Sequence, residues 1–258
     1  MMTSLMLFAG ALVAAWPGEA IDVRFAPDGA LGARWVALSF AEGATLVVLE
    51  TKVTCAQWQM VMGAIPRSME KACAEPETAV GWVTPLSALE FANRLSDLEG
   101  LDRCYDIVGG TGPAETGERL DPWFVTSITT CTGYRLPMPR EWLALLDSEP
   151  LLEDRSQRGN IAWVSERWES PQVARKWPSY YGLYDIAGDM QELGFLPGEP
   201  ERQTEDLPPW RDVEEQRICL FACHNDRLVP CREGFGLRGF FPYWGRIASV
   251  GLRLVRSY

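Results

Sequence analysis

The sequence predicts one compact domain that combines a sheet with a few helices and much irregular loop. Of the 258 residues, 47% are hydrophobic, which is enough to bury a sizeable core. Near the start of the chain, short apolar runs alternate with Gly and Asp turns, as is typical of antiparallel strands. Later segments carry apolar residues at helical spacing, and no stretch between the polar loops is large enough for a second core.

The strands are expected between residues 21 and 50, and a short helix is expected next, from Thr54 to Met62. Thr54 and Gln57 have the spacing of a capping box, in which each side chain accepts a hydrogen bond from the other residue's backbone N–H. Gly63 suits the exit of the helix. A sheet is therefore expected to open the domain and to lead directly into a helix.

A second helix is expected over residues 85–98. Thr84 precedes it as a cap, Pro85 suits the first helical position, and Gly100 follows its end. Its apolar residues form one stripe at helical spacing: Ala88, Phe91, Ala92 and Leu95. Core packing is the simplest role for this stripe.

A third helix is expected to begin near Pro139, in the stretch GYRLPMPREW. Pro137 and Pro139 block helix before them, and Pro139 suits a first helical turn. Glu141 then lies near the positive end of the helix dipole. Between the helices, long loops are expected in three regions rich in Gly, Thr, Asp and Pro: 105–132, 147–160 and 196–216.

The charge and the first residues of the chain bear on partners and location. The net charge of -11 disfavours nucleic acid and anionic membranes, and favours cationic ligands or metal ions. Residues 1–20 have the apolar core and the small residues of a signal peptide, although a buried first strand or helix is the alternative. The seven cysteines favour an oxidising compartment with disulfides. We therefore expect a periplasmic or secreted domain over residues 21–258, without a membrane-spanning segment in the mature chain.

Five segments occur in a recognisable order. They are Glu50–Gly63 (ETKVTCAQWQMVMG), Val80–Tyr105 (VGWVTPLSALEFANRLSDLEGLDRCY), Gly133–Trp142 (GYRLPMPREW), Tyr180–Leu193 (YYGLYDIAGDMQEL) and Val250–Ser257 (VGLRLVRS). Together they resemble the formylglycine-generating enzyme family, also called the sulfatase-modifying-factor family, over about residues 45 to 258. The resemblance implies one α+β domain of the C-type-lectin-like kind, with a small twisted antiparallel sheet, few helices and much ordered loop.

The resemblance also implies a disulfide. Secreted bacterial members of this family often carry a cysteine-bearing loop before the G-Y-R-L-P segment, which here pairs Cys104 with Cys131. Two buried thiols are the alternative. Spacing alone leaves the pairing of the other five cysteines open.

Enzymes of this family oxidise a substrate cysteine with copper held by two thiolates, which are soft ligands suited to Cu(I). Cys231 stands at the place of the second thiolate, but Asp226 stands where its partner is expected. Three other sets of copper ligands are the alternatives, and none has the family spacing: Cys223 with Cys231, Cys219 with Cys223, or a mixed set that includes His224. His224 is the only histidine, so this chain alone cannot supply a two-histidine iron or zinc site.

The segment GDMQEL stands at a turn that helps to form a calcium site in the family. Oxygen ligands on a tight loop suit a hard cation, so the resemblance implies a Ca²⁺ site from Asp185, Asp189 and Glu192. A solvated acidic turn is the alternative. Further along, the aromatic-rich residues 234–246 have the composition of a binding surface, with core packing as the alternative.

The sequence therefore leaves two candidate functions. The first is an exported, non-catalytic binding or accessory protein that holds a protein or peptide client, and the misplaced thiolate favours it. The second is a copper-dependent oxidase of the formylglycine-generating type, which acts on a cysteine or another side chain of a client through Cys223 and Cys231. The sequence leaves open whether the protein is an enzyme, because a fold does not transmit a function when the site residues differ.

Overall fold

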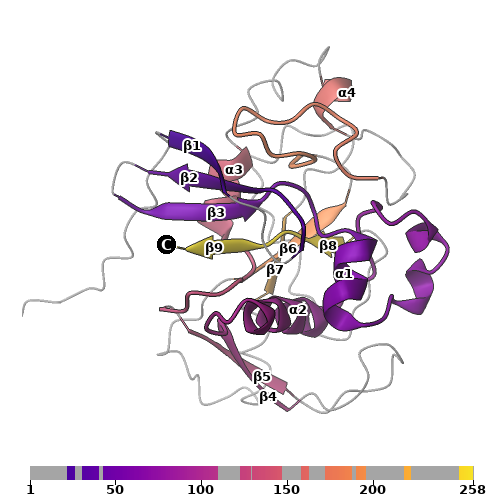
Figure 1. The fold of residues 1–258 in the computed structure, drawn as a ribbon, viewed down its shortest axis with the longest axis vertical. Coiled ribbons are helices and arrows are strands. Elements are labelled where there is room, and N and C mark those ends of the chain that lie inside the picture. The colour runs from indigo at the N-terminus through magenta and orange to yellow at the C-terminus, as the bar shows by residue number, and fades with distance from the viewer. Residues whose placement is uncertain are drawn as a thin grey trace, which may run out of the picture.

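The chain has the α+β architecture that the sequence predicts, with a small antiparallel sheet and few helices (Figure 1). The computed structural model describes residues 22–26, 31–40, 43–109, 123–128, 130–146, 158–162, 172–187, 190–195, 218–221 and 250–257. The predicted signal peptide and the aromatic-rich residues 234–246 lie outside these ranges. Within them, no helix is both long and apolar enough to span a bilayer.

Four antiparallel strands form the main sheet, in the order β1-β2-β3-β9. Their bounds are Asp22–Ala26 for β1, Trp35–Ser39 for β2, Thr45–Leu49 for β3 and Val255–Ser257 for β9. β2 pairs with β3 through Val36 opposite Val48, and β3 pairs with β9 through Leu46 opposite Ser257. The sheet therefore joins the beginning of the domain to residues some 200 positions later in the sequence.

Both faces of this sheet are buried, and the side chains of β2 and β3 alternate between two apolar clusters. Val36, Leu38, Leu46 and Val48 pack with Trp142 and Leu145 of a helix on one face. Trp35, Val47 and Leu49 pack with Leu86, Phe91 and Leu95 of a helix on the other face. The alternation follows from the period of two along a strand.

The helices confirm the predicted caps. α1 (Cys55–Met62) begins after Thr54, whose side chain forms a capping box with Gln57, and it ends at Gly63 with a left-handed φ of 83°. α2 (Pro85–Leu98) begins after Thr84, whose side chain forms a second capping box with Ser87. The rings of Trp58 and Phe91 stack with their centroids 5.2 Å apart and join the two helices.

The remaining short helices are η1 (Arg67–Met69), η2 (Ala72–Ala74), α3 (Pro139–Leu146) and α4 (Arg158–Ile161). α3 begins at Pro139, as predicted. α4 lies at one end of the molecule (Figure 1) and falls at the end of the stretch predicted as loop, 147–160. Four residues are too few to produce a helical period that a sequence pattern could reveal.

Two smaller sheets complete the fold. β6 (Gln191–Phe195) lies between β7 (Ile218–Phe221), which is antiparallel to it, and β8 (Val250–Leu252), which is parallel to it. β4 (Tyr105–Gly109) pairs with β5 (Trp123–Ser127) as an antiparallel pair. The prediction of one long loop over 105–132 is therefore wrong at both ends. The Gly- and Thr-rich middle of that stretch masked the short β-forming runs YDIV and WFVT on either side.

Candidate functional site

Three charged side chains meet where the main sheet joins the β6 sheet, and we call Lys52, Glu192 and Arg253 the ionic centre. Lys52 follows β3, Glu192 belongs to β6, and Arg253 connects β8 to β9. All three side chains are at most 2% exposed. Charged side chains at this depth have to be paired, and these three come from segments far apart in the sequence.

Arg253 uses every N–H of its guanidinium group. Nε donates to both carboxylate oxygens of Glu192 at 3.2 and 3.3 Å, and Nη2 donates to Glu192 Oε1 at 3.1 Å. Nη1 donates to the carbonyls of Leu49 and Glu50, at 3.0 and 2.8 Å, and Nη2 also donates to the Tyr184 carbonyl at 2.7 Å. The side chain therefore links β3, β6 and the loop that contains Tyr184.

Lys52 is the second cation beside Glu192. Its Nζ lies 3.4 Å from Glu192 Oε1 and donates to the backbone carbonyl of Asp185 at 2.5 Å. Burial alone would raise the pKa of Glu192, but the charges of Arg253 and Lys52 and their hydrogen bonds hold this pKa below its usual value. Glu192 is thus an ionised carboxylate that is paired with two cationic side chains.

The predicted calcium residues have separate surroundings. Glu192 belongs to the ionic centre, while Asp185 is buried and accepts from the Ala174 N–H at 2.8 Å through Oδ2. Its Oδ1 has no hydrogen-bond partner among the described residues. Within the same residues, no three or more Cys, His, Asp and Glu side chains lie close enough together to hold a metal ion. Asp189 lies outside the described residues, so calcium binding stays a prediction, which a Ca²⁺-dependent rise in Tm that Asp189→Ala abolishes would support.

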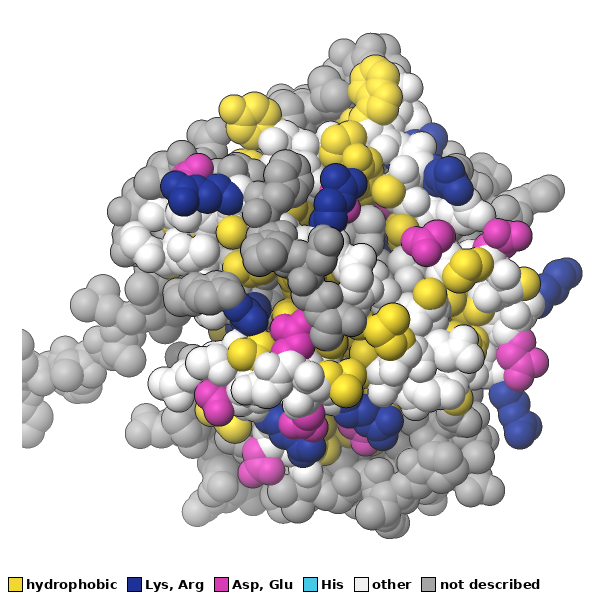
Figure 2. All heavy atoms as spheres, in the orientation of Figure 1, with side chains coloured by type: hydrophobic (Ala, Val, Ile, Leu, Met, Phe, Trp, Pro, Cys, Tyr) yellow, Lys and Arg dark blue, Asp and Glu magenta, His cyan; other side chains and the backbone are white. Residues whose placement is uncertain are grey.

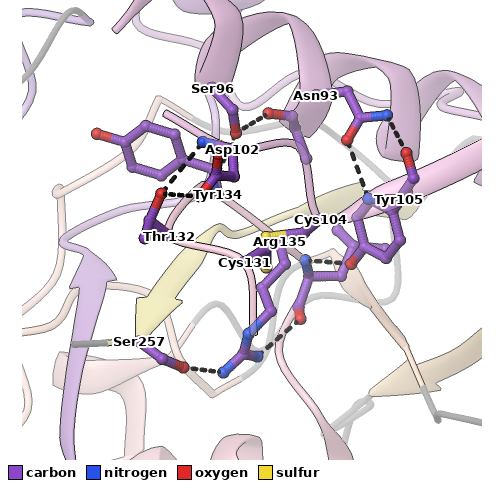
Figure 3. Close-up of a disulfide and its surroundings, with 12 residues drawn as sticks. Asn93, Ser96, Asp102, Cys104, Tyr105, Cys131, Thr132, Tyr134, Arg135 and Ser257 are labelled. Atoms are coloured by element: carbon purple, nitrogen blue, oxygen red, sulfur yellow. Dashed lines mark hydrogen bonds between the residues drawn. A yellow bond between two sulfur atoms is a disulfide. The ribbon is translucent and has the colours of Figure 1, made fainter. Parts of the chain in front are cut away.

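Four of the cysteines form two disulfides. Cys104 is joined to Cys131, which is the pair that the resemblance implies (Figure 3). Cys55 is joined to Cys73, a pair that the sequence left open. The backbone of Cys219 lies in β7 opposite Gly194. The predicted copper ligands Cys223 and Cys231, together with His224 and Asp226, lie outside the described residues, so the copper site stays a prediction.

The GYRLPMPREW stretch serves the fold. The guanidinium of Arg135 donates to both oxygens of Glu141, at 2.6 and 2.7 Å, and also to Ser257 Oγ at 2.7 Å. Glu141 also accepts from the Met138 N–H at 2.8 Å, which caps the first turn of α3. Burial opposes the charged form of Arg135, but the Glu141 carboxylate outweighs burial and raises the pKa of Arg135 above its usual value.

A different feature faces solvent at the end of the molecule that carries α4. Trp177 and Tyr180 are 57% and 77% exposed, and hydrophobic side chains stand out at this end in Figure 2. The backbone N–H of Trp177 donates to the Asn160 carbonyl of α4 at 2.8 Å, which holds the backbone of Trp177 against that helix. We call residues 177–183 the aromatic turn.

Hydrogen bonds make the aromatic turn a closed loop. The Gly182 N–H donates to the Ser179 carbonyl at 2.8 Å, and the Ser179 N–H donates to the Leu183 carbonyl at 2.7 Å. The Leu183 N–H also donates to Ser179 Oγ at 3.2 Å, and Gly182 has a left-handed φ of 80°. Tyr181 is buried and anchors the turn, while its neighbour Tyr180 points to solvent. Sequence reasoning missed this surface, although Pro178 and Gly182 around an aromatic pair are a turn signal.

No protein-family model and no curated protein matches the chain. Among solved structures, Treponema denticola variable protein 1 has a TM-score of 0.59 and 19% sequence identity to it, over 92% of this chain and 92% of that chain. CarF has a TM-score of 0.49 and 19% identity, over 83% of this chain and 87% of that chain. PvdO from Pseudomonas aeruginosa has a TM-score of 0.47 and 13% identity, over 94% of this chain and 92% of that chain. The similarity to variable protein 1 shows a shared fold over nearly the whole chain.

Proposed function

We propose that this protein is an exported, non-catalytic binding protein on a fold of the formylglycine-generating-enzyme type, and that the aromatic turn holds its protein or peptide partner. The observation that carries the proposal is the exposure of Trp177 and Tyr180 on a hydrogen-bonded turn. Large aromatic side chains that face solvent are common anchors of interfaces, because each one removes a large apolar area from water on binding.

The rigidity of the turn strengthens this argument. A binding loop that is disordered before binding loses conformational entropy when the partner arrives, whereas a preformed loop does not. The bonds among Ser179, Gly182 and Leu183, and the bond from Trp177 to α4, form within the protein itself. The backbone that carries Trp177 and Tyr180 is thus held in place without a partner.

The cysteines favour binding over catalysis. Cys55, Cys73, Cys104 and Cys131 form disulfides and are not available as thiolate ligands. The family position for the partner of Cys231 holds Asp226, whose carboxylate is a hard ligand that suits Cu(I) poorly. Two disulfides also fit an oxidising compartment, in support of a periplasmic or secreted protein.

The test compares variants of the turn with matched variants elsewhere. Trp177→Ala and Tyr180→Ala remove the exposed rings, while Met60→Ala and Leu98→Ala remove side chains that are 60% and 62% exposed on α1 and α2. The partner is captured by cross-linking in native extract, identified by mass spectrometry, and titrated as a purified protein. We expect each turn variant to weaken its affinity at least about tenfold, and the control variants to leave it unchanged. Equal affinity for all four variants and the wild type would refute the proposal.

The copper-dependent oxidase is the second candidate, favoured by the position of Cys231 alone. A Cu(I) titration of the reduced protein against a competing chelator, beside Cys223→Ser and Cys231→Ser, separates the two functions. Tight one-to-one binding that either variant abolishes would favour the oxidase. The binding protein predicts weak copper binding that neither substitution changes.

A further inference from the structure

The two disulfides share one property that governs their reduction. Each joins a fully buried cysteine, Cys55 or Cys104, to a partly exposed one, Cys73 or Cys131. A reductant therefore attacks Cys73 or Cys131, and the buried cysteine has to leave as a thiolate. The surroundings of the buried cysteine then decide which disulfide breaks more readily.

The two leaving groups have different surroundings. Cys55 is the first residue of α1, where the positive end of the helix dipole stabilises a thiolate. Cys104 lies just before β4, inside the apolar cluster that also contains Phe91 and Leu136. An anion in an apolar environment is disfavoured. Cys55 is therefore the better leaving group.

The segments that carry the exposed cysteines are also held differently. Cys131 stays beside Cys104 even without the disulfide, because the Ile128 N–H donates to the Cys104 carbonyl and Thr132 Oγ1 donates to Asp102 Oδ2. Figure 3 shows Thr132 and Asp102 next to this disulfide. Such bonds keep the two sulfurs close and favour the oxidised form.

Cys73 lies in a segment with little other support. Within residues 64–75, Met69 is the one buried side chain, Ile65 packs partly buried against the main apolar cluster, and the others are partly or fully exposed. The hydrogen bonds that tie this segment to other parts of the fold lie near its end, where Gln172 Nε2 donates to Glu75 Oε2 at the surface, the Ala56 N–H donates to the Pro76 carbonyl and the Cys55 N–H donates to the Thr78 carbonyl. Loss of the disulfide would therefore free residues 64–75 and leave the rest of the fold in place.

We propose that the Cys55–Cys73 disulfide is a thiol–disulfide exchange site for a dithiol reductant, and that its reduction releases residues 64–75. One thiolate of the dithiol attacks Cys73 Sγ, the bond between the two sulfurs breaks, and Cys55 leaves with the electron pair and takes a proton. The second thiolate of the dithiol then attacks its own mixed-disulfide sulfur and releases Cys73. The dithiol becomes a cyclic disulfide, and the cysteine pair gains two electrons and two protons.

The test uses the wild-type chain and dithiothreitol. Protein equilibrated with graded reduced dithiothreitol, at a fixed concentration of oxidised dithiothreitol, is quenched with N-ethylmaleimide, and peptide mass spectrometry gives the labelled fraction of each cysteine. We expect Cys55 and Cys73 to be labelled at a dithiothreitol concentration at least about tenfold lower than Cys104 and Cys131, equivalent to about 30 mV between the two couples. Equal midpoints, or earlier labelling of Cys104 and Cys131, would overturn the proposal.

Hydrogen exchange tests the second half of the proposal at the concentration that reduces only the first pair. Amide exchange over residues 64–75 should rise, while α2 should keep its protection. The double variant Cys55→Ala/Cys73→Ala should show the same local rise without reductant. An unchanged exchange rate over 64–75 in both samples would contradict the release of this segment.

Discussion

Arg253 and Glu192 lie 61 residues apart in the sequence, yet Arg253 donates to both carboxylate oxygens of Glu192 in a site closed to water. The same guanidinium holds the carbonyls of Leu49 and Glu50, so one side chain fixes β3 against β6. A buried network of this kind stabilises the fold only while all its members are present, because any member left alone is an unpaired buried group.

Replacement of Arg253 is expected to be severely destabilising. Arg253→Met leaves Glu192 with Lys52 alone and leaves the carbonyls of Leu49, Glu50 and Tyr184 without this donor. We expect the free energy of unfolding, measured in urea, to fall by about 3–5 kcal/mol.

The control for Arg253→Met is an ion pair at the surface. Arg103→Met removes an exposed arginine that pairs with Asp97 at 2.6 Å. This change should lower the free energy of unfolding by about 1 kcal/mol or less, because solvent screens the pair. Similar losses of unfolding free energy in the two variants would show that the ionic centre does not fix β3 against β6.

The stability of the fold should fall in acid because of Glu192. The charges of Arg253 and Lys52 hold the folded-state pKa of Glu192 below the ordinary value of 4.5, against the effect of burial. A lowered folded-state pKa means that the stabilisation is present above pH 4.5 and is lost as the pH falls from there through the folded-state value.

Urea unfolding of the wild type and Glu192→Gln at a series of pH values measures this effect. The variant should be less stable at neutral pH, because Arg253 and Lys52 lose their counter-charge. Its stability should also depend less on pH below 4.5, since it lacks the titrating carboxyl. Parallel pH profiles would assign the acid sensitivity to other groups.

Gly133→Ala should disrupt the packing of α2 against residues 133–137. A Cβ at position 133 would overlap the Asp102 carbonyl and the Ser96 hydroxyl, and would lie 2.8 Å from Ser96 Cβ. The Ser96 hydroxyl accepts the Tyr134 N–H at 2.8 Å, so it cannot move without loss of that bond. We expect a loss of about 1–3 kcal/mol or more. Gly159→Ala is the matched control, because nothing lies within 4 Å of its Cβ position, and thermal unfolding of both variants tests the difference.

Removal of the Cys104–Cys131 disulfide should destabilise the fold. The two cysteines are 27 residues apart, and closure of a loop of that length contributes about 3.5 kcal/mol in the chain-entropy model. Cys104→Ala/Cys131→Ala should lower the free energy of unfolding in urea by about that amount. A loss near zero would mean that the β4–β5 pairing and the Asp102–Thr132 bonds persist in the unfolded chain and restrict it even without the disulfide.

Local sequence signals predicted the parts of the fold that depend on interactions between residues close together in the sequence. The capping box of Thr54 and Gln57, the proline at the start of α2 and the proline at position 139 each determine a helix start within a few residues. β1, β2 and β3 of the main sheet were predicted because their apolar runs end at Gly and Asp turns, whereas its fourth strand, β9, was not predicted. The β4–β5 pair was missed because its two strands are short and flank a stretch with a strong loop composition.

The candidate sites depend on distant contacts, which the sequence does not reveal. Lys52 and Arg253 resemble ordinary surface cations within ETKVT and GLRLV, and nothing local pairs them with Glu192. The Cys55–Cys73 bond was one of many pairings open to seven cysteines. Exposure of Trp177 and Tyr180 is equally a property of the packed chain, since an aromatic residue in a turn can be buried, as Tyr181 is.

The position of β9 in the main sheet has a consequence for the order of events during synthesis. Arg253, which neutralises Glu192, and Val255, which pairs with Val48, are translated about 200 residues after β3. A nascent chain that ends before residue 253 therefore cannot complete either the sheet or the ionic centre. The domain has to fold after the ribosome has made residue 257, and until then its two apolar sheet faces are open to chaperones and to aggregation.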